Sequence, residues 1–173
     1  TVDDSGRIYS VDNTDSVQTK IIKYDNNLNY LETYFLGEKL YIFEINYFDN
    51  RIYISSPNSI RIYDLNLNII TTVTLDYSPS TFTIGSENNT TYIFTVNNTD
   101  KTIRKYSQTG TQVSSYNTYK EILDIEFGND GYFYCIAQHY NNNFYPPRPE
   151  GVEIYKTDLN GNDTTIPVSG DGN

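Results

Sequence analysis

The sequence predicts an all-β protein with room for one ordinary domain, and three observations support this. Strand-forming residues are abundant in the 173-residue chain, above all Tyr (18) and Phe (8), together with Thr and Ile. Good helix formers are scarce, since Ala137 is the one alanine and Met is absent. No segment carries apolar residues at amphipathic-helix spacing over two turns, whereas clusters of Asn, Asp and Gly mark frequent tight turns.

An internal repeat of about 42 residues organises the chain. Its first element is a short strand after an Asp, Asn or Gly turn, in residues 6–9, 50–53, 89–93 and 131–134. Taking Tyr9, Tyr53, Ile93 and Tyr134 as equivalent aligns the four copies. Apolar residues on both sides of this strand are typical of a buried strand, so we expect it to be the innermost strand of its sheet.

Three further strands complete each copy. The second alternates in polarity and occupies residues 20–25, 60–64, 102–107 and 152–158. The third is expected in residues 30–35, 69–75, 112–118 and 163–168, and the fourth in residues 40–47, 81–86 and 121–127. Four strands in about 42 residues, joined by short turns, are typical of a β-propeller blade. The sequence therefore predicts about four four-stranded antiparallel blades, with repeats at residues 6–49, 50–89, 90–130 and 131–173.

The first and last copies carry the clearest repeat pattern, in residues 2–12 with 22–25 and in residues 131–134 with 154–162. This pattern resembles the NHL-like, six-bladed type of β-propeller repeat, in four degenerate copies that cover essentially the whole chain. The second and third copies lack the Asp-x-x-Gly turn of that pattern. The resemblance implies a propeller fold, and it leaves the activity open because that superfamily includes lyases, lactonases, phytase-like enzymes and pure binding modules.

Four blades lie at the low end of the range for propellers. We therefore interpret residues 1–173 as a single propeller or as a segment of a larger one. Residues 1–3 are placed to add an outermost strand to the last blade. An open set of blades leaves an apolar face and strand edges unprotected, so further blades or self-association are the expected partners.

The charge balance excludes several classes of partner. Lys and Arg total 12 against 22 Asp and Glu, which gives a net charge of −10 and disfavours binding to nucleic acid or to anionic lipid. No apolar run approaches the roughly 20 residues that cross a bilayer, so no membrane insertion is expected. One Cys and one His exclude an internal disulfide and a His-rich metal site.

Carboxylates recur in the turns that lead into the first strand of each copy: Asp3, Asp49, Glu87 and Asp130. In a propeller such turns gather on one face, where an acidic ring would bind a divalent cation such as calcium. The alternative is local, because Asp and Asn favour tight turns through hydrogen bonds to the backbone. Residues 158–163 also resemble the start of a calcium loop, but Asn160-Gly161 is a strong hairpin signal and no bidentate Glu follows.

One segment, residues 139–151, breaks the repeat by extending the loop between first and second strands. Its aromatic and basic residues suit contact with a protein or a glycan. The alternative is a loop that packs over the molecule itself. The candidate binding residues are His139, Tyr140, Phe144, Tyr145 and Arg148. Cys135 and His139 are four residues apart on one strand, too far for a catalytic dyad.

Four sequons are candidate glycosylation sites, at Asn88, Asn89, Asn97 and Asn162. A chain this rich in Asn, Ser and Thr also produces sequons by chance. With no catalytic set in view, we expect a non-enzymatic, extracellular or cell-surface propeller module for protein or carbohydrate binding or for structural assembly. The alternative is a divalent-cation-dependent hydrolase or lyase of the NHL-like kind, which would need the turn carboxylates to converge on one ion.

Overall fold

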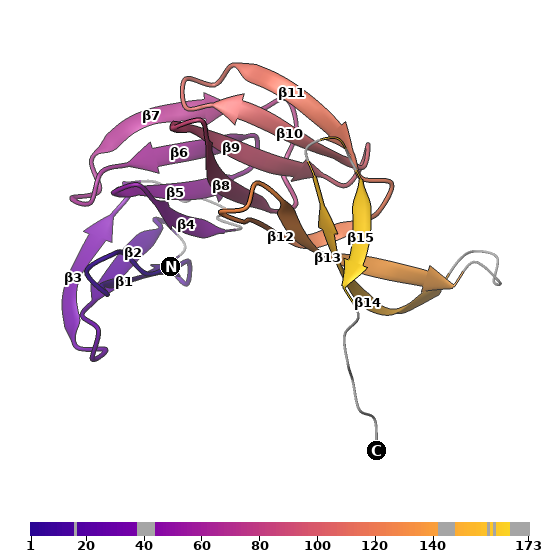
Figure 1. Ribbon diagram of the computed structural model, residues 1–173. Helices are drawn as coiled ribbons and strands as arrows, with labels where there is room; N and C mark the ends of the chain where they lie inside the picture. The colour runs from indigo at the N-terminus through magenta and orange to yellow at the C-terminus, as the bar shows by residue number, and fades with distance from the viewer. Residues whose placement is uncertain (16, 38–43, 142–147, 159, 161, 167–173) are drawn as a thin grey trace. The chain divides into compact units, whose positions relative to one another are not determined.

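The computed structural model describes residues 1–15, 17–37, 44–141, 148–158, 160 and 162–166, without the side chains of residues 139–141, 148–150 and 165. Every regular element in these residues is a β-strand, in four antiparallel sheets (Figure 1). The fold is thus all-β with the sheets of a propeller, as the sequence predicts. No helix in the described residues is long and apolar enough to span a membrane.

The sheets follow the chain in order. The first contains β1 (Ile8–Asp12), β2 (Lys20–Tyr24) and β3 (Tyr30–Phe35). The second contains β4 (Ile45–Phe48), β5 (Arg51–Ser56), β6 (Ser59–Tyr63) and β7 (Ile69–Thr74). The third contains β8 (Phe82–Glu87), β9 (Thr90–Asn97), β10 (Thr102–Ser107) and β11 (Gln112–Asn117). The fourth contains β12 (Ile122–Phe127), β13 (Phe133–Asn141), β14 (Arg148–Thr157) and β15 (Asp163–Ile166).

The strands that share a sheet differ from the grouping that the sequence predicts. The strand expected to end one copy (β4, β8 or β12) is the first strand of the next sheet, paired with the strand that follows it. The reason lies in the turns: Asp49-Asn50 and Asn88-Asn89 both have positive φ at two central residues, which is the type I′ geometry that joins adjacent antiparallel strands. The repeat boundaries at residues 49/50 and 89/90 therefore fall within hairpins, and β5, β9 and β13 are second strands rather than innermost ones.

Residues 1–3 also differ from the expectation, because they pair with their own sheet. Val2 forms a bridge with Ile8, and the Tyr9 amide donates to the Thr1 carbonyl at 2.9 Å. The segment thus extends the three-stranded first sheet at the position that β4, β8 and β12 hold in the others.

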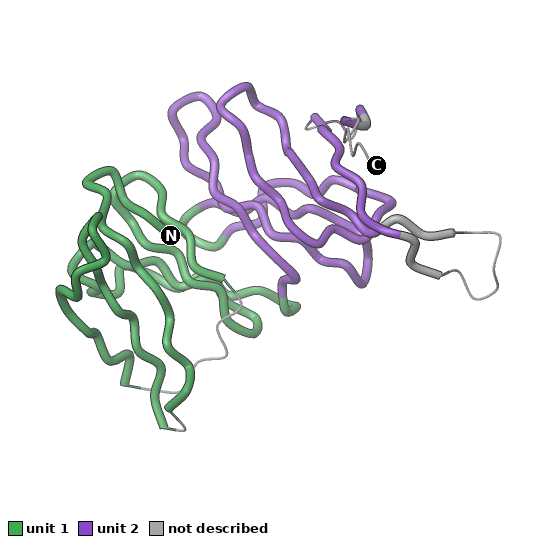
Figure 2. Tube along the Cα trace, turned by 90° about the horizontal axis from the view of Figure 1, so that it is seen from below, with its two compact units in different colours: residues 1–78, 108–110 green, residues 79–107, 111–173 purple. Residues whose placement is uncertain are grey.

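Two compact units make up the chain (Figure 2). The first unit contains residues 1–78 and 108–110, and its core joins Tyr9 and Ile21 of the first sheet to Ile52, Ile54 and Tyr63 of the second.

The second unit contains residues 79–107 and 111–173. In its core the Phe94 ring stacks on Phe127 at 4.8 Å and meets the edge of Phe133 at 5.0 Å. Asn98 adds a polar clamp between the third and fourth sheets, since its side-chain amide both donates to and accepts from the backbone of Ile122.

Candidate functional site

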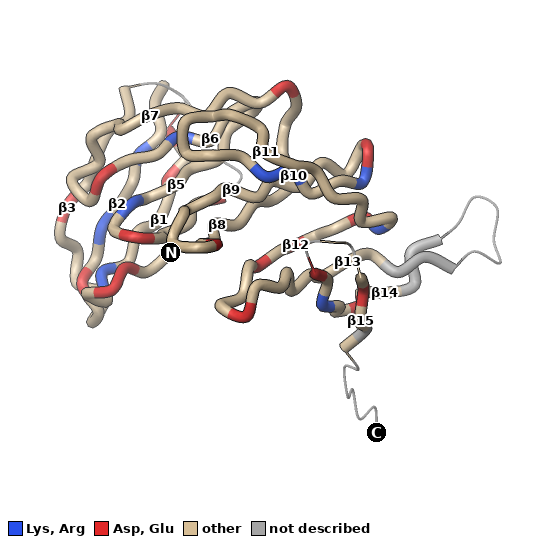
Figure 3. The backbone as a smooth tube through the Cα atoms, turned by 45° about the horizontal axis from the view of Figure 1, so that its top comes forward, with Lys and Arg blue, Asp and Glu red and all other residues tan. Residues whose placement is uncertain are grey.

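Many of the acidic residues lie in turns (Figure 3), and the four turn carboxylates come from four different sheets. Asp3 precedes β1, and Asp49 occupies the β4–β5 turn with a φ of 50°. Glu87 ends β8, and Asp130 lies in the loop between β12 and β13. Their surroundings decide whether they are available to a metal ion.

Asp3 has both carboxylate oxygens occupied by its own turn. One oxygen accepts the amides of Ser5 and Arg7, each at 2.9 Å. The other accepts Arg7 Nε at 2.6 Å and the Tyr9 hydroxyl at 3.0 Å, and the side chain is only 1% exposed. Burial alone would raise the pKa of Asp3, but these hydrogen bonds outweigh it and lower the pKa below its ordinary value.

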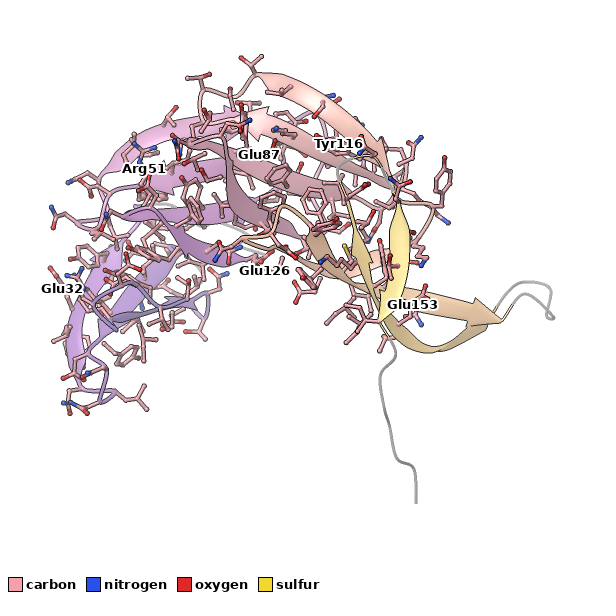
Figure 4. The ribbon with its side chains drawn as sticks, viewed as in Figure 1. Glu32, Arg51, Glu87, Tyr116, Glu126 and Glu153 are labelled. Carbon is pink, nitrogen blue, oxygen red and sulfur yellow. The ribbon has the colours of Figure 1, made fainter. Side chains whose placement is uncertain are left out.

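Glu87 forms an ion pair with Lys105 of β10, at 2.7 Å. The Lys105 ammonium lies 3.8 Å from the centre of the Tyr92 ring and 5.9 Å from that of Phe94, in cation–π contact. The Lys105 side chain is 8% exposed and the Glu87 side chain 20%. This charge pair is therefore held in a largely dry, aromatic environment. Figure 4 shows Glu87 at the end of its strand.

Asp130 repeats this arrangement on the fourth sheet. It accepts Lys156 Nζ at 2.7 Å and the Tyr134 hydroxyl at 2.9 Å, while Lys156 lies 3.9 Å from the centre of the Tyr132 ring. Lys156 is the main cause that lowers the pKa of Asp130, followed by Tyr134. Here the Asp130 side chain is 44% exposed, so the same combination of acid, lysine and tyrosine faces solvent.

Three of the four turn carboxylates are thus counterions to cations of their own sheets. A metal ion at any of them would have to displace an Arg or Lys that is already bonded. Within the residues that the structure describes, no group of three or more His, Cys, Asp and Glu side chains is placed to hold a metal. The sequence showed the acids but not their partners, because each lysine lies 18 or 26 residues further along the chain.

Asp158, Asn160 and Asn162 of the calcium-loop pattern lie in the hairpin turn between β14 and β15. One oxygen of Asp158 accepts the amides of Asn160 and Asn162, and the other accepts the Asn162 side-chain amide at 2.8 Å. Asn162 contributes most to lowering the pKa of Asp158 to about 2. The same bonds recur from Asp25 and Asp64, so the motif is the repeated turn before the last strand of a sheet.

Cys135 is a core residue, 1% exposed, and burial raises the pKa of its thiol to about 12. Its strand partner is Tyr155, whereas His139 pairs with Gly151 further along the same hairpin. The side chain of His139 lies outside the described residues. Cys135 packs in the core and has none of the properties of an activated nucleophile.

Part of the segment expected to be a long loop is strand. The β13–β14 pairing continues to Asn141 opposite Arg148, so His139, Tyr140 and Arg148 lie on a long hairpin. The side chains of these three residues, and Phe144 and Tyr145 altogether, lie outside the described residues. Binding through this hairpin stays a prediction.

The four sequons differ in accessibility. Asn88 and Asn89 form the exposed β8–β9 turn. Asn97 is 8% exposed, and its side-chain oxygen accepts the Thr99 amide, so burial disfavours this position as an acceptor. Asn162 is exposed, but its side-chain nitrogen donates to Asp158.

Each sheet has one aromatic residue at the same position of the repeat. In all four sheets this residue pairs with the corresponding residue of the next strand. Tyr9 pairs with Lys23, Tyr53 with Ile62, Phe94 with Lys105 and Tyr134 with Lys156. This alignment replaces Ile93 by Phe94, because Ile93 lies on the opposite face of β9. We call these four residues the marker aromatics: Tyr9, Tyr53, Phe94 and Tyr134.

The marker aromatics differ sharply in burial. Tyr9, Tyr53 and Phe94 are at most 1% exposed, whereas Tyr134 is 36% exposed. Tyr134 belongs to the face of the fourth sheet that points away from the core, where Ile136, Ile154 and Ile166 form a row across three strands and Val152 is 60% exposed. We call this surface the free face of the fourth sheet.

No family model matches the sequence, and no curated protein matches it. Solved structures of similar fold do match. One is a catalytically inactive histidine-to-alanine variant of virginiamycin B lyase from Staphylococcus aureus with quinupristin, with a TM-score of 0.65 and 17% identity over 98% of this chain and 54% of that chain. A streptogramin B lyase has a TM-score of 0.58 and 15% identity over 99% of this chain and 57% of that one.

A protein of unknown function from Bacteroides caccae is similar at a TM-score of 0.57, with 12% identity over 95% of this chain and 58% of that chain. At these identities the likeness establishes the fold and no more. The chain spans about half the length of the structures it matches.

Proposed function

We propose that this chain is a non-catalytic β-propeller module, extracellular or at the cell surface, that binds protein and builds assemblies through an exposed sheet face. The observation that carries the proposal is the exposure of Tyr134, at the one marker position of the four that is not covered. An apolar face rimmed by charged residues is the usual character of a protein-binding surface. The NHL-like assignment of the repeat forms part of this proposal and is supported by the patterns in residues 2–12 and 131–134.

The bonding of the turn acids supports a structural role over catalysis. Asp3, Glu87 and Asp130 each neutralise a cation of their own sheet. Such carboxylates stabilise turns and strand pairs, and each is already bonded to a cation. A divalent-cation-dependent lyase or hydrolase would need them free to converge on an ion.

The decisive experiment is a turnover assay with quinupristin, the compound present in the matching lyase structure. The purified chain is incubated with quinupristin in the presence of magnesium or calcium, or of EDTA, and the products are separated by chromatography and identified by mass spectrometry. We expect quinupristin to remain intact under all conditions. Conversion that requires the divalent cation and stops with EDTA would overturn the proposal in favour of the lyase alternative.

Use of the exposed sequons, one support for the extracellular part of the proposal, is tested by expression in a eukaryotic secretory host. We expect removal of the paired sequons, by Asn88→Gln with Asn89→Gln, to reduce the shift in mass on deglycosylation. The matched control is Asn97→Gln, at the buried sequon, which should leave that shift unchanged. A secreted chain that carries no glycan at Asn88 or Asn89 would remove this support.

A further inference from the structure

We propose that the free face of the fourth sheet docks against the first sheet of a second copy of this chain. This inference rests on the proposed function, because it names the partner of the same exposed face. The packing of neighbouring sheets within each unit supports it.

Within each unit, the marker aromatic of one sheet is covered by the sheet that follows it. In the first unit, Tyr9 packs with Ile52 and Ile54 of the second sheet. In the second unit, Phe94 packs with Phe127 and Phe133 of the fourth sheet. In both units, the covering element is the next sheet along the chain.

The lysines opposite the marker aromatics show the same pattern. Lys23 and Lys105, on the covered faces, are 9% and 7% exposed. The side chain of Lys156, on the free face, is 29% exposed although it makes the same ion pair and ring contacts as Lys105. The free face of the fourth sheet thus has the residue types of a covered face, but these residues are exposed to solvent.

The first sheet presents the matching surface. Its side away from the core carries Val2, Ile8, Ile22, Tyr24 and Phe35, with Val2 53% and Phe35 59% exposed. In strand register this side corresponds to the sides of the second and fourth sheets that cover Tyr9 and Phe94. A first sheet can therefore cover Tyr134 in the way that the fourth sheet covers Phe94.

A second copy is the occupant that supplies this surface. The chain covers 54% and 57% of the two lyase chains, so two copies together contain about the amount of sheet present in one such propeller. The contact joins different surfaces of the two copies, which makes it heterologous. Burial of Val152, Tyr134 and the isoleucine row on one copy, and of Phe35 and Val2 on the other, provides the apolar area.

The test is the mass of the intact chain in solution, measured by light scattering over a range of concentrations. We expect self-association that Val152→Glu weakens at least about tenfold, because a charge is buried in the contact. Phe35→Glu should have the same effect from the other surface. The matched control is Val113→Glu on β11, where an equally exposed valine (52%) lies on neither surface.

Mixing the two interface variants tests the heterologous arrangement. Each variant keeps one intact surface, so an equimolar mixture of Val152→Glu and Phe35→Glu should recover a dimer that neither forms alone. A wild-type chain that stays monomeric overturns the inference, as does association that survives both substitutions. Far-UV circular dichroism verifies that the variants are folded. A monomeric result leaves the non-catalytic assignment standing, because the quinupristin assay decides that separately.

Discussion

The two ion pairs of the third and fourth sheets predict a large difference in stability between matched variants. Lys105 and Lys156 hold equivalent positions, and each bonds a turn carboxylate at 2.7 Å and lies over a tyrosine ring. Replacement by Met keeps most of the aliphatic stem and removes the charge. Lys105→Met leaves Glu87 without its partner in a mostly buried place, and one oxygen of that carboxylate is already buried without a hydrogen bond.

The expected magnitudes follow from burial. Removing one partner of a buried pair costs about 3–5 kcal/mol, which the 20% exposure of the Glu87 side chain reduces to about 2–3 kcal/mol. The Asp130 side chain is 44% exposed, so Lys156→Met should cost much less than Lys105→Met, because solvent screens this pair. In a chain of this size, each kcal/mol corresponds to about 2–4 °C in melting temperature.

The assay is urea unfolding followed by far-UV circular dichroism and tyrosine fluorescence, since the chain has no Trp. A double-mutant cycle with Glu87→Gln measures the coupling within the Lys105 pair, and Asp130→Asn with Lys156→Met is the exposed counterpart. Equal losses for the two lysine variants, or a loss at Lys105 below about 1 kcal/mol, would refute the conclusion that Glu87 is a buried internal counterion.

Three further predictions concern single sites. Gly85→Ala should destabilise the fold by about 1–3 kcal/mol or more in urea unfolding, with Ser86→Ala as the exposed control, because a Cβ at Gly85 would lie 2.0 Å from a Phe127 ring atom. Asp3→Asn should lower the melting temperature at neutral pH and flatten its decline below about pH 4: the lowered pKa means that the carboxylate stabilises the fold above its unfolded pKa and loses this effect as pH falls towards the folded one. An unchanged pH profile would contradict this. Cys135 should react with a thiol reagent at least about a hundredfold more slowly in the folded than in the unfolded chain, and rapid native labelling would show that it is accessible.

The strand content of the protein follows from the sequence alone. The sequence predicts strands at residues 30–35 and 102–107, which are β3 and β10 in the structure. Local properties are sufficient here, because strand propensity, alternation and turn residues act over a few positions. The repeat is visible for the same reason, since each copy must solve the same packing problem.

Which strands share a sheet could not be predicted from the sequence, because it depends on the geometry of the turns. The sequence predicts a boundary between repeats at Asp49-Asn50, yet the two positive φ values there form the hairpin that joins β4 to β5. The lysines that pair with the turn acids could not be predicted from the sequence either. Glu87 and Lys105 meet because β8, β9 and β10 are neighbours in register, which no local pattern encodes.

Burial was decided by the tertiary structure. Tyr9 and Tyr134 are both tyrosines at equivalent positions of the repeat, so the sequence predicts the same environment for both. The structure covers Tyr9 with the second sheet and leaves Tyr134 36% exposed. The residue type determines that an aromatic ring favours burial, but only the packing of another sheet determines whether the ring is buried.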